Sequence, residues 1–129
     1  MAQIPSEFDD LFAKPILFAL ATVMSDGQPQ VTPVWGDIVN GQPRINTAVG
    51  RQKDKNLKER PQATVMLVDP ENPQRWIEVR GTVTGTTEGA DAHIDSLAKK
   101  YLGVDSYPYR NPAETRITFS ITPTKVTHS

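Results

Sequence analysis

Apolar and polar residues alternate along several short segments of the chain, and this spacing is typical of β-strands with one buried face. The longest alternation covers residues 76–87. One face of this predicted strand carries Ile77, Val79, Gly81 and Val83, and the other carries Trp76, Glu78 and Arg80. Because glycine in a strand often marks a bulge, we expect a bend at Gly81 or Gly85.

Five further strands are predicted from apolar runs that are bounded by turn-forming residues. They cover residues 17–24, 30–39, 44–49, 63–68 and 116–121, and the last extends through Val126. Residues 25–27 predict a turn, and the pair Asn40-Gly41 predicts a tight hairpin. The pattern therefore predicts six strands.

Three helices are predicted between these strands. A short amphipathic helix begins at Ser6, its expected cap, and ends at Lys14. Residues 52–59 also have helical spacing. The third helix covers residues 88–102, and Gly103 follows where glycine commonly ends a helix. Its apolar stripe consists of Ala90, Ile94, Leu97, Ala98 and Tyr101.

Early hairpins and a single long helix favour an antiparallel barrel, closed or nearly closed, over a fold built from βαβ units. The predicted class is mainly β (α+β): a six-stranded antiparallel barrel with a few short helices. No repeat, linker or shift in composition marks an internal boundary. We therefore expect one domain over residues 1–129.

Composition excludes several classes of chemistry. The chain has no cysteine, which excludes disulfides, thiolate nucleophiles and thiolate metal sites. Its 14 basic and 15 acidic residues give a net charge of −1, so no global field attracts nucleic acid and any anion site is local. The longest apolar stretch, residues 15–24, is too short to span a membrane. We expect a cytoplasmic protein with neither a nucleic-acid nor a membrane partner.

The segment from Asn46 to Leu57 carries an unusual charge pattern, because a strand stops at Gly50 and a basic helix follows. Cations in the first turn of a helix oppose the macrodipole, and a bound anion reverses that penalty. Arg51 and Lys53 therefore indicate a phosphate site. The alternative is an ordinary solvated face, with Asp54 already offsetting the dipole.

Several motifs are informative together. They are Pro29-Gln30-Val31-Thr32-Pro33-Val34-Trp35, Asn46-Thr47, Gly50-Arg51-Gln52-Lys53 and Asn56-Leu57. This set resembles the pyridoxamine-phosphate-oxidase-like flavin-binding split barrels. Later segments are Glu78-Val79-Arg80-Gly81, residues 89–103 and Tyr107-Pro108-Tyr109-Arg110. They resemble the family's actinobacterial subgroup, which uses the deazaflavin coenzyme F420. The resemblance covers nearly the whole chain, from Leu17 to Val126, and implies a split barrel.

The resemblance also implies where the cofactor binds. It places the cofactor phosphate at Gly50, Arg51, Gln52 and Lys53, with Asn56 one turn further along. It places the flavin ring against the strand of Gln30 and Thr32, and Pro33, Asn46 and Thr47 are further expected cofactor contacts. For Gln30 and Thr32 the alternative is a plain solvent-facing edge, since the neighbouring prolines confine this strand to the edge of a sheet.

The expected cofactor is F420, with FMN as the alternative. F420 carries an oligoglutamate tail beyond its phosphate, and Lys55, Lys58 and Arg60 lie just past the expected phosphate site. This basic cluster is interpreted as a guide for the tail. It is equally typical of an ordinary wet surface, where single ion contacts contribute little.

The family builds its site between two subunits, so the resemblance implies a homodimer with cofactor sites at the subunit interface. The residues expected to approach the partner's cofactor are Trp76, Arg80, Lys99, and Tyr101 or the loop at Tyr107. Large aromatic residues in strands are usually core or interface residues. We accordingly expect Trp35 in the core and Trp76 in the dimer interface.

No catalytic side chain is predicted. His93 lies between Asp91 and Asp95, but side chains two positions apart on a helix diverge, so no metal site is expected. Neither histidine has a serine at nucleophile spacing, and no close pair of carboxylates can be placed. Arg75 follows a turn and is a candidate to bind a carboxylate of a substrate or of the cofactor tail.

The resemblance implies an F420-dependent oxidoreductase that transfers hydride between the deazaflavin and a small conjugated organic substrate, tetrapyrrole-like or quinone-like. In such a protein the cofactor carries the chemistry, so no catalytic dyad is required. A non-catalytic F420 or FMN carrier uses the same binding residues and is the first alternative. An FMN-dependent pyridoxamine-phosphate oxidase is the second, although the segment after Arg116 offers few cations for its phosphorylated substrate.

Overall fold

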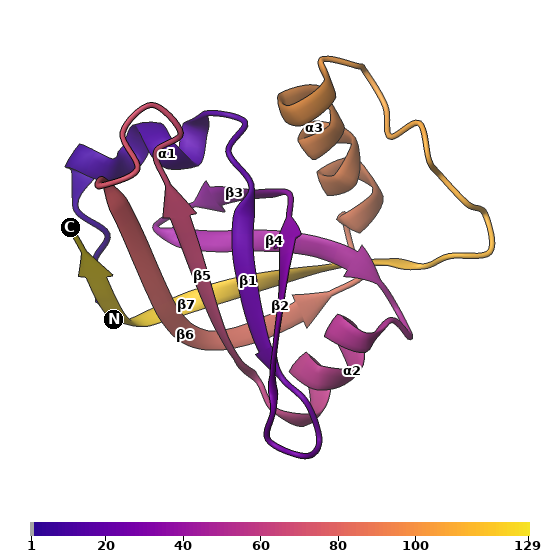
Figure 1. The fold of residues 1–129 in the computed structure, drawn as a ribbon. Coiled ribbons are helices and arrows are strands. Elements are labelled where there is room, and N and C mark those ends of the chain that lie inside the picture. The colour runs from indigo at the N-terminus through magenta and orange to yellow at the C-terminus, as the bar shows by residue number, and fades with distance from the viewer. Residues whose placement is uncertain (1) are drawn as a thin grey trace.

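The computed structural model describes residues 2–129, which contain one antiparallel sheet curled into a split barrel (Figure 1). Its strands are β1 (Phe18–Val23), β2 (Pro29–Val34), β3 (Gly36–Val39), β4 (Gln42–Ala48), β5 (Gln62–Val68), β6 (Trp76–Thr86) and β7 (Arg116–His128). They lie side by side in the order β2-β1-β5-β6-β7-β4-β3. The predicted class, a mainly β antiparallel split barrel, is confirmed.

The described chain has seven strands where six were predicted, because the segment over residues 30–39 is not one strand. Trp35 divides it into β2 and β3. β2 pairs with β1 at one edge of the sheet, whereas β3 pairs with β4 at the other edge. Trp35 therefore links the two edges of the split barrel. At the next position, Gly36, the ring of Phe18 fills the space that a Cβ would need.

The longest strands, β6 and β7, form the most extensive ladder of the sheet. Their register shifts between Arg80 and Gly81, so the predicted bend lies at Gly81. A Cβ at Gly81 would meet the backbone oxygen of Thr122, which explains why no larger residue fits there. Such a bulge increases the local twist and helps a sheet to curl.

Three α-helices and one 3-10 segment flank the sheet in the described residues. The 3-10 segment η1 (Ser6–Phe8) leads into α1 (Asp9–Ala13), which covers one end of the barrel (Figure 1). α2 (Gln52–Glu59) contacts β1 and β4, and α3 (Ala90–Leu102) contacts β7 and β4.

The helix ends differ from the prediction at two places. The expected cap at Ser6 is wrong, because Pro5 holds the cap position of η1 and no side chain caps either η1 or α1. α3 begins at Ala90 rather than at residue 88, because Gly89 adopts a left-handed conformation with φ 74°. Gly103 ends α3 in a second left-handed conformation, as predicted.

The apolar core lies on the inner face of the curled sheet, between the strands and α1. Its largest fully buried side chains include Phe12, Phe18, Leu20, Ile45, Leu67 and Ile77. The rings of Phe12 and Phe18 pack edge to face with centroids 5.7 Å apart. The core therefore fills the barrel between the sheet and α1.

Candidate functional site

A cavity of about 360 Å³ opens where the β2–β3 link, the end of β4, the start of α2 and the loop before β7 meet. Its walls consist of Leu17, Pro33, Val34, Trp35, Asn46, Thr47, Arg51, Lys53, Ile94, Tyr107, Tyr109 and Arg116. We refer to it as the Trp35 pocket. Its mixture of apolar walls and a few polar groups is typical of small-molecule sites. The fold thus brings together these expected cofactor contacts: Pro33, Asn46, Thr47, Arg51 and Lys53.

Arg51, Lys53 and Arg116 give the Trp35 pocket a positive wall. Burial lowers the pKa of Lys53, and the nearby charge of Arg51 lowers it further. Burial also lowers the pKa of Arg116, with Arg51 again acting in the same direction. Both shifts show that the charged forms are held at a cost, which a bound anion would offset.

Arg116 is the most enclosed of these cations, with 8% of its surface exposed. Its Nε donates a hydrogen bond to Oδ1 of Asn46 at 2.9 Å, and its guanidinium carbon lies 5.3 Å from the ring centroid of Tyr107. Its Nη1 has no hydrogen-bond partner. A buried donor without a partner is costly, so the geometry favours an acceptor at this position.

A chain of polar groups, with His93 buried and Asp37 and Arg44 half-buried, holds Asn46 from behind. Its Nδ2 donates to the carbonyl oxygen of Ala90 at 2.9 Å and lies 3.2 Å from Nδ1 of His93. The other ring nitrogen of His93 lies 3.3 Å from Oδ2 of Asp37. Asp37 accepts two hydrogen bonds from Arg44, and these partners together with His93 lower the pKa of Asp37 to about 2 despite its burial. The chain fixes the orientation of Asn46 and, through it, of Arg116.

Aromatic side chains form the opposite wall. Trp35 stacks on Tyr101 with ring centroids 5.4 Å apart and meets Tyr107 edge-on at 6.1 Å. The hydroxyl of Tyr101 donates to the carbonyl oxygen of Ile16 at 2.6 Å, and burial raises the pKa of Tyr101 to about 12. The expectation of Trp35 in the core is wrong. As the link between two sheet edges, it stays half-buried beside the pocket.

At the first turn of α2, side chains rather than the free backbone N–H groups of the helix terminus are available to bind an anion. Gly50 has φ 92°, a conformation that favours glycine, and its N–H donates to Oδ2 of Asp54 at 2.9 Å. Asp54 is buried and also pairs with Lys58 at 3.0 Å. A protein carboxylate therefore already offsets the helix dipole, as the alternative interpretation held. The anion-binding groups that remain are the side chains of Arg51 and Lys53.

Asn56 and Gln52 serve the attachment of α2 to the sheet. Asn56 is fully buried, and its Nδ2 donates to Oγ1 of Thr22 on β1 at 3.0 Å. Its Oδ1 accepts a hydrogen bond from Nε2 of Gln52 at 2.7 Å. Neither residue lines the Trp35 pocket. Both act by holding α2, and with it Arg51 and Lys53, against β1.

Gln30 and Thr32 lie on β2, which is an edge strand as the flanking prolines predicted. They pair with Thr22 and Leu20 of β1, so their side chains share the inner face with those buried residues. Oε1 of Gln30 and Oγ1 of Thr32 are buried without hydrogen-bond partners. A solvent-facing edge does not describe them, although the Trp35 pocket does not include them.

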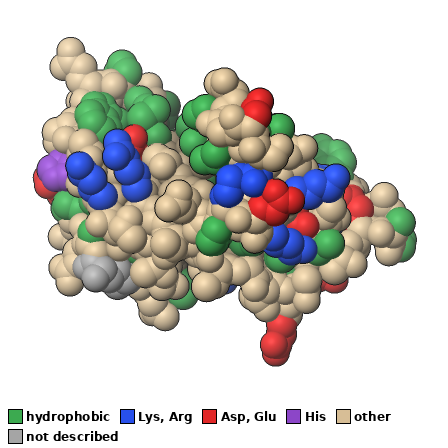
Figure 2. All heavy atoms as spheres, turned by 90° about the horizontal axis from the view of Figure 1, so that it is seen from below, with side chains coloured by type: hydrophobic (Ala, Val, Ile, Leu, Met, Phe, Trp, Pro, Cys, Tyr) green, Lys and Arg blue, Asp and Glu red, His purple; other side chains and the backbone are tan. Residues whose placement is uncertain are grey.

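Lys55 and Lys58 lie on the surface of α2, just beyond the pocket. Both are exposed, and Figure 2 shows basic side chains interleaved with acidic ones over the region of this helix. Lys58 is paired with Asp54, and Arg60 donates to the carbonyl oxygen of Val23 at 2.7 Å and pairs with Glu59. Of the three cations, Lys55 is in the most open setting.

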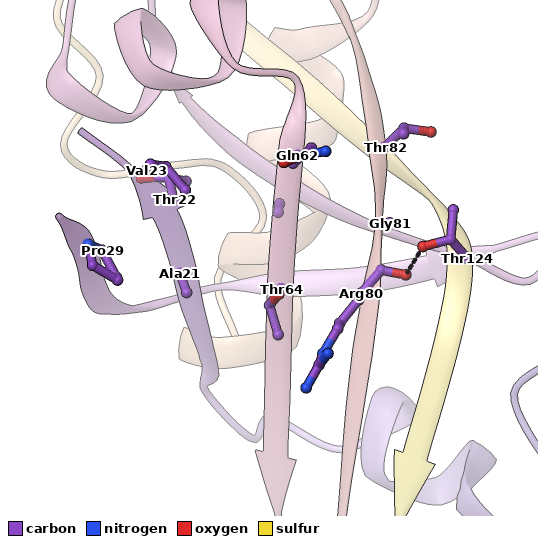
Figure 3. Close-up of a pocket in the computed structure, with 11 residues that line it drawn as sticks. Ala21, Thr22, Val23, Pro29, Gln62, Thr64, Arg80, Gly81, Thr82 and Thr124 are labelled. Carbon is purple, nitrogen blue, oxygen red and sulfur yellow. Dashed lines mark hydrogen bonds between the residues drawn. The ribbon is translucent and has the colours of Figure 1, made fainter. Parts of the chain in front are cut away.

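Of the residues expected to act from a partner subunit, Tyr107 lines the Trp35 pocket of its own chain, whereas Trp76, Arg80, Lys99 and Tyr101 do not. Trp76 starts β6 near α1, Lys99 is exposed on α3, and Tyr101 stands behind Trp35. Arg80 lines a second cavity, of about 460 Å³, on the outer face of the sheet (Figure 3). There its carbonyl oxygen accepts a hydrogen bond from Oγ1 of Thr124 at 3.2 Å, and its side chain extends along the strands.

Sequence reasoning missed several walls of the pocket, above all Arg116. In the sequence Arg116 is only the first residue of an apolar strand. The groups that position it, Asn46 and Tyr107, are far away along the chain. No local pattern therefore identifies Arg116, whereas Tyr107 lies in a loop that resembles the F420 subgroup.

Two features are absent from residues 2–129. No three His, Asp or Glu side chains in this part of the chain come close enough together to hold a metal ion. Likewise, none of its helices has the length and hydropathy needed to cross a membrane.

Comparison with known proteins identifies the family of this chain. The model of the pyridoxamine 5'-phosphate oxidase family matches residues 4–129. The chain belongs to this family. A solved F420 reductase is 31% identical, with a TM-score of 0.83 over 96% of this chain and 98% of that one. This similarity places the chain in the F420 subgroup of the family. No curated protein sequence matches it.

Other solved structures share the fold of this pyridoxamine 5'-phosphate oxidase family member at lower identity. A conserved hypothetical protein from Mycobacterium tuberculosis is 22% identical, with a TM-score of 0.78 over 99% of this chain and 85% of that one. The heme storage protein HutZ from Vibrio cholerae is 13% identical, with a TM-score of 0.69 over 98% and 95%. At such identities the likeness shows the fold alone, and the fold serves both oxidoreductases and a storage protein.

Proposed function

We propose that the protein is an F420-dependent oxidoreductase that transfers hydride between the deazaflavin and a small conjugated organic substrate, tetrapyrrole-like or quinone-like. The observation that carries the proposal is the positive wall of the Trp35 pocket. Arg51, Lys53 and the buried, partly unpartnered Arg116 converge there on one cavity. The 31% identity to an F420 reductase supplies the class of cofactor.

The residues present fit a phosphate-bearing planar cofactor. Nη1 of Arg116 is a buried donor without an acceptor, and a phosphate oxygen has the matching chemistry. Oε1 of Gln30 and Oγ1 of Thr32 are further buried polar atoms without partners, on the strand expected to face the ring. Trp35 and Tyr107 offer apolar surface in the pocket that Arg116 lines.

When bound in its reduced form, the deazaflavin supplies the hydride. The chain's own part is to bind, orient and exclude water. Arg51 and Lys53 hold the anionic end, and Asn46 keeps Arg116 in place through its 2.9 Å hydrogen bond. The stacked pair of Trp35 and Tyr101 gives one wall a fixed plane, which limits the approach of water and of the acceptor.

We further propose that two copies complete each site. Trp76, Arg80 and Lys99 lie away from the pocket of their own chain, so they would reach a cofactor only in a partner. The large apolar side chains of Val31 on β2 and Met66 on β5 are exposed at 62% and 39%. Exposed apolar residues of this size support association. Light scattering should give the mass of a dimer, and a monomer at micromolar concentration contradicts the shared site.

Titration of the purified protein with F420 and with FMN, followed by fluorescence, tests the cofactor. We expect tighter binding of F420, and oxidation of reduced F420 when a tetrapyrrole-like or quinone-like acceptor is added. Tight F420 binding without turnover of any acceptor would identify a carrier instead. Preference for FMN, together with oxidation of pyridoxamine phosphate, would identify the FMN-dependent oxidase.

A further inference from the structure

A carboxylate of the protein already lies between two of the cations at the Trp35 pocket. Oε2 of Glu114 accepts a hydrogen bond from Nη2 of Arg51 at 2.5 Å. The same oxygen lies 3.8 Å from Nη1 of Arg116, which is an ion-pair distance but too long for a hydrogen bond. Glu114 therefore satisfies one arginine and leaves the buried donor of the other unfilled.

The backbone around Glu114 is fixed, so movement of its side chain does not require the loop to open. The N–H of Glu114 donates to the carbonyl oxygen of Asn111 at 2.9 Å, and the next residue, Thr115, accepts from the N–H of Val49 at 2.8 Å. Further back, Asp95 on α3 accepts hydrogen bonds from the N–H of Tyr107 and from Arg110. Only the carboxylate of Glu114 has to swing away to free the two guanidinium groups.

We infer that Glu114 is a built-in counter-ion that a phosphate-type oxyanion displaces when it binds between Arg51 and Arg116. The inference deepens the proposed function and rests on its anion site. In the free protein the carboxylate offsets the repulsion between the two cations: Arg51 and burial lower the pKa of Arg116, whereas Glu114 acts in the opposite direction. A phosphate presents more acceptor oxygens than one carboxylate, and so it can satisfy both Nη2 of Arg51 and Nη1 of Arg116.

Displacement has a measurable consequence, because a ligand that competes with an internal group binds more weakly than it would to the empty cations. Glu114 thus sets the affinity of the site and favours ligands with a full phosphate charge. Ligands that lack the phosphate do not compete with Glu114, and removal of its charge should leave their affinity unchanged.

The test is the variant Glu114→Gln, which keeps the size of the side chain and removes its charge. We expect inorganic phosphate and FMN to bind about three- to tenfold more tightly than to the unaltered protein, since binding no longer has to break the ion pair between Glu114 and the exposed Arg51. Riboflavin, which lacks the phosphate, should bind unchanged. The matched control is Glu88→Gln, which removes the same charge from an exposed turn before α3. Calorimetry gives the affinities, and thermal unfolding shows that both variants fold.

Equal or weaker phosphate binding by Glu114→Gln overturns the inference, as does a gain of the same size in Glu88→Gln or for riboflavin. Failure to detect phosphate binding to either protein also overturns it. These outcomes are distinct from failure of the proposed function. If Glu114→Gln gains phosphate affinity but the protein neither binds nor oxidises F420, the role of Glu114 as a counter-ion is supported and the proposed oxidoreductase activity is contradicted.

Discussion

Two arginines at opposite ends of the barrel show how its structural and its functional regions differ. Arg75, next to α1, donates from Nη1 to Asp10 and Asp69 and from Nη2 to Asp10 and the carbonyl oxygen of Glu7. Arg116 is more deeply buried, yet its Nη1 donates to nothing. The interpretation of Arg75 as a receptor for a ligand carboxylate is wrong, because protein carboxylates already occupy its donors.

The same contrast extends beyond the two arginines. In residues 2–129 the buried side-chain atoms without hydrogen-bond partners are Gln30 Oε1, Thr32 Oγ1, Asp54 Oδ1, His93 Nε2 and Arg116 Nη1. All of them belong to β2, α2, α3 or β7, and none belongs to the end covered by α1. Unpartnered polar groups are costly in a folded protein. Their concentration on one side supports the proposal that a ligand binds there.

Mutations at the end of the barrel covered by α1 should change stability, and Phe18→Ala is expected to have the largest effect. Phe18 is fully buried, packs against Phe12 and fills the space beside Gly36. Its removal should lower the free energy of unfolding by about 3–5 kcal/mol, measured by denaturant titration. Val39→Ala, at an exposed edge position, should change it by less than about 0.5 kcal/mol. Similar losses in both variants would mean that the core does not lie at this end.

Mutations at the Trp35 pocket should change the affinity for the cofactor. A paired comparison of Lys53→Ala and Arg75→Ala tests this. Loss of the Lys53 charge should weaken F420 and FMN about 10- to 100-fold, because a hydrogen bond to a charged group is lost. Arg75→Ala should lower the Tm and leave both affinities unchanged, since its partners are internal. Fluorescence titration and thermal unfolding of the two variants separate the effects. Equal loss of cofactor affinity in the two variants would contradict the difference proposed between the Trp35 pocket and the end covered by α1.

Much of this fold could be predicted because local pattern and global structure agree. Strand alternation placed β6, with its bend at Gly81, and helical spacing placed α2 with the observed bounds. The division at Trp35 could not be predicted, because Gly36 and Asp37 interrupt the apolar residues only briefly before Ile38 and Val39. Only closure of the barrel separates β2 from β3, and closure is a property of the whole sheet.

The candidate site divides in a similar way. Arg51 and Lys53 could be singled out, because their charges conflict with the local helix. Arg116 and Glu114 could not, since each gains its meaning from groups brought close only by folding. The chain from Arg44 through Asp37 and His93 is equally non-local.

The ion pair of Asp37 with Arg44, behind Asn46, is satisfied within the protein, and Asp37→Asn tests its contribution to stability by pH. The pKa of Asp37 in the folded protein is lowered from 3.8 to about 2. A lowered pKa adds stability above pH 3.8 that is lost as the pH falls towards 2. The unaltered protein should therefore exceed Asp37→Asn in stability by about 2 kcal/mol at pH 7, and the difference should shrink between about pH 4 and pH 2. A constant difference over this range, measured by denaturant titration, would place the effect in packing rather than in charge.

The smallest expected effect concerns the exposed cations of α2 and the choice between F420 and FMN. Lys55 lies in the open, whereas Lys58 is held by Asp54 at 3.0 Å, so Lys55→Glu should act more strongly than Lys58→Glu. Exposed charges contribute little individually, and the double variant should weaken F420 only about two- to fivefold. FMN has no anionic tail and should bind almost unchanged. The matched control is Lys125→Glu on β7, which removes a similarly exposed charge far from α2. Because such interactions are screened, the effect on F420 should also fade as salt is added. Equal weakening of F420 and FMN binding would assign these lysines to the phosphate site itself. The cofactor site would then extend further along α2 than the buried atoms without partners indicate.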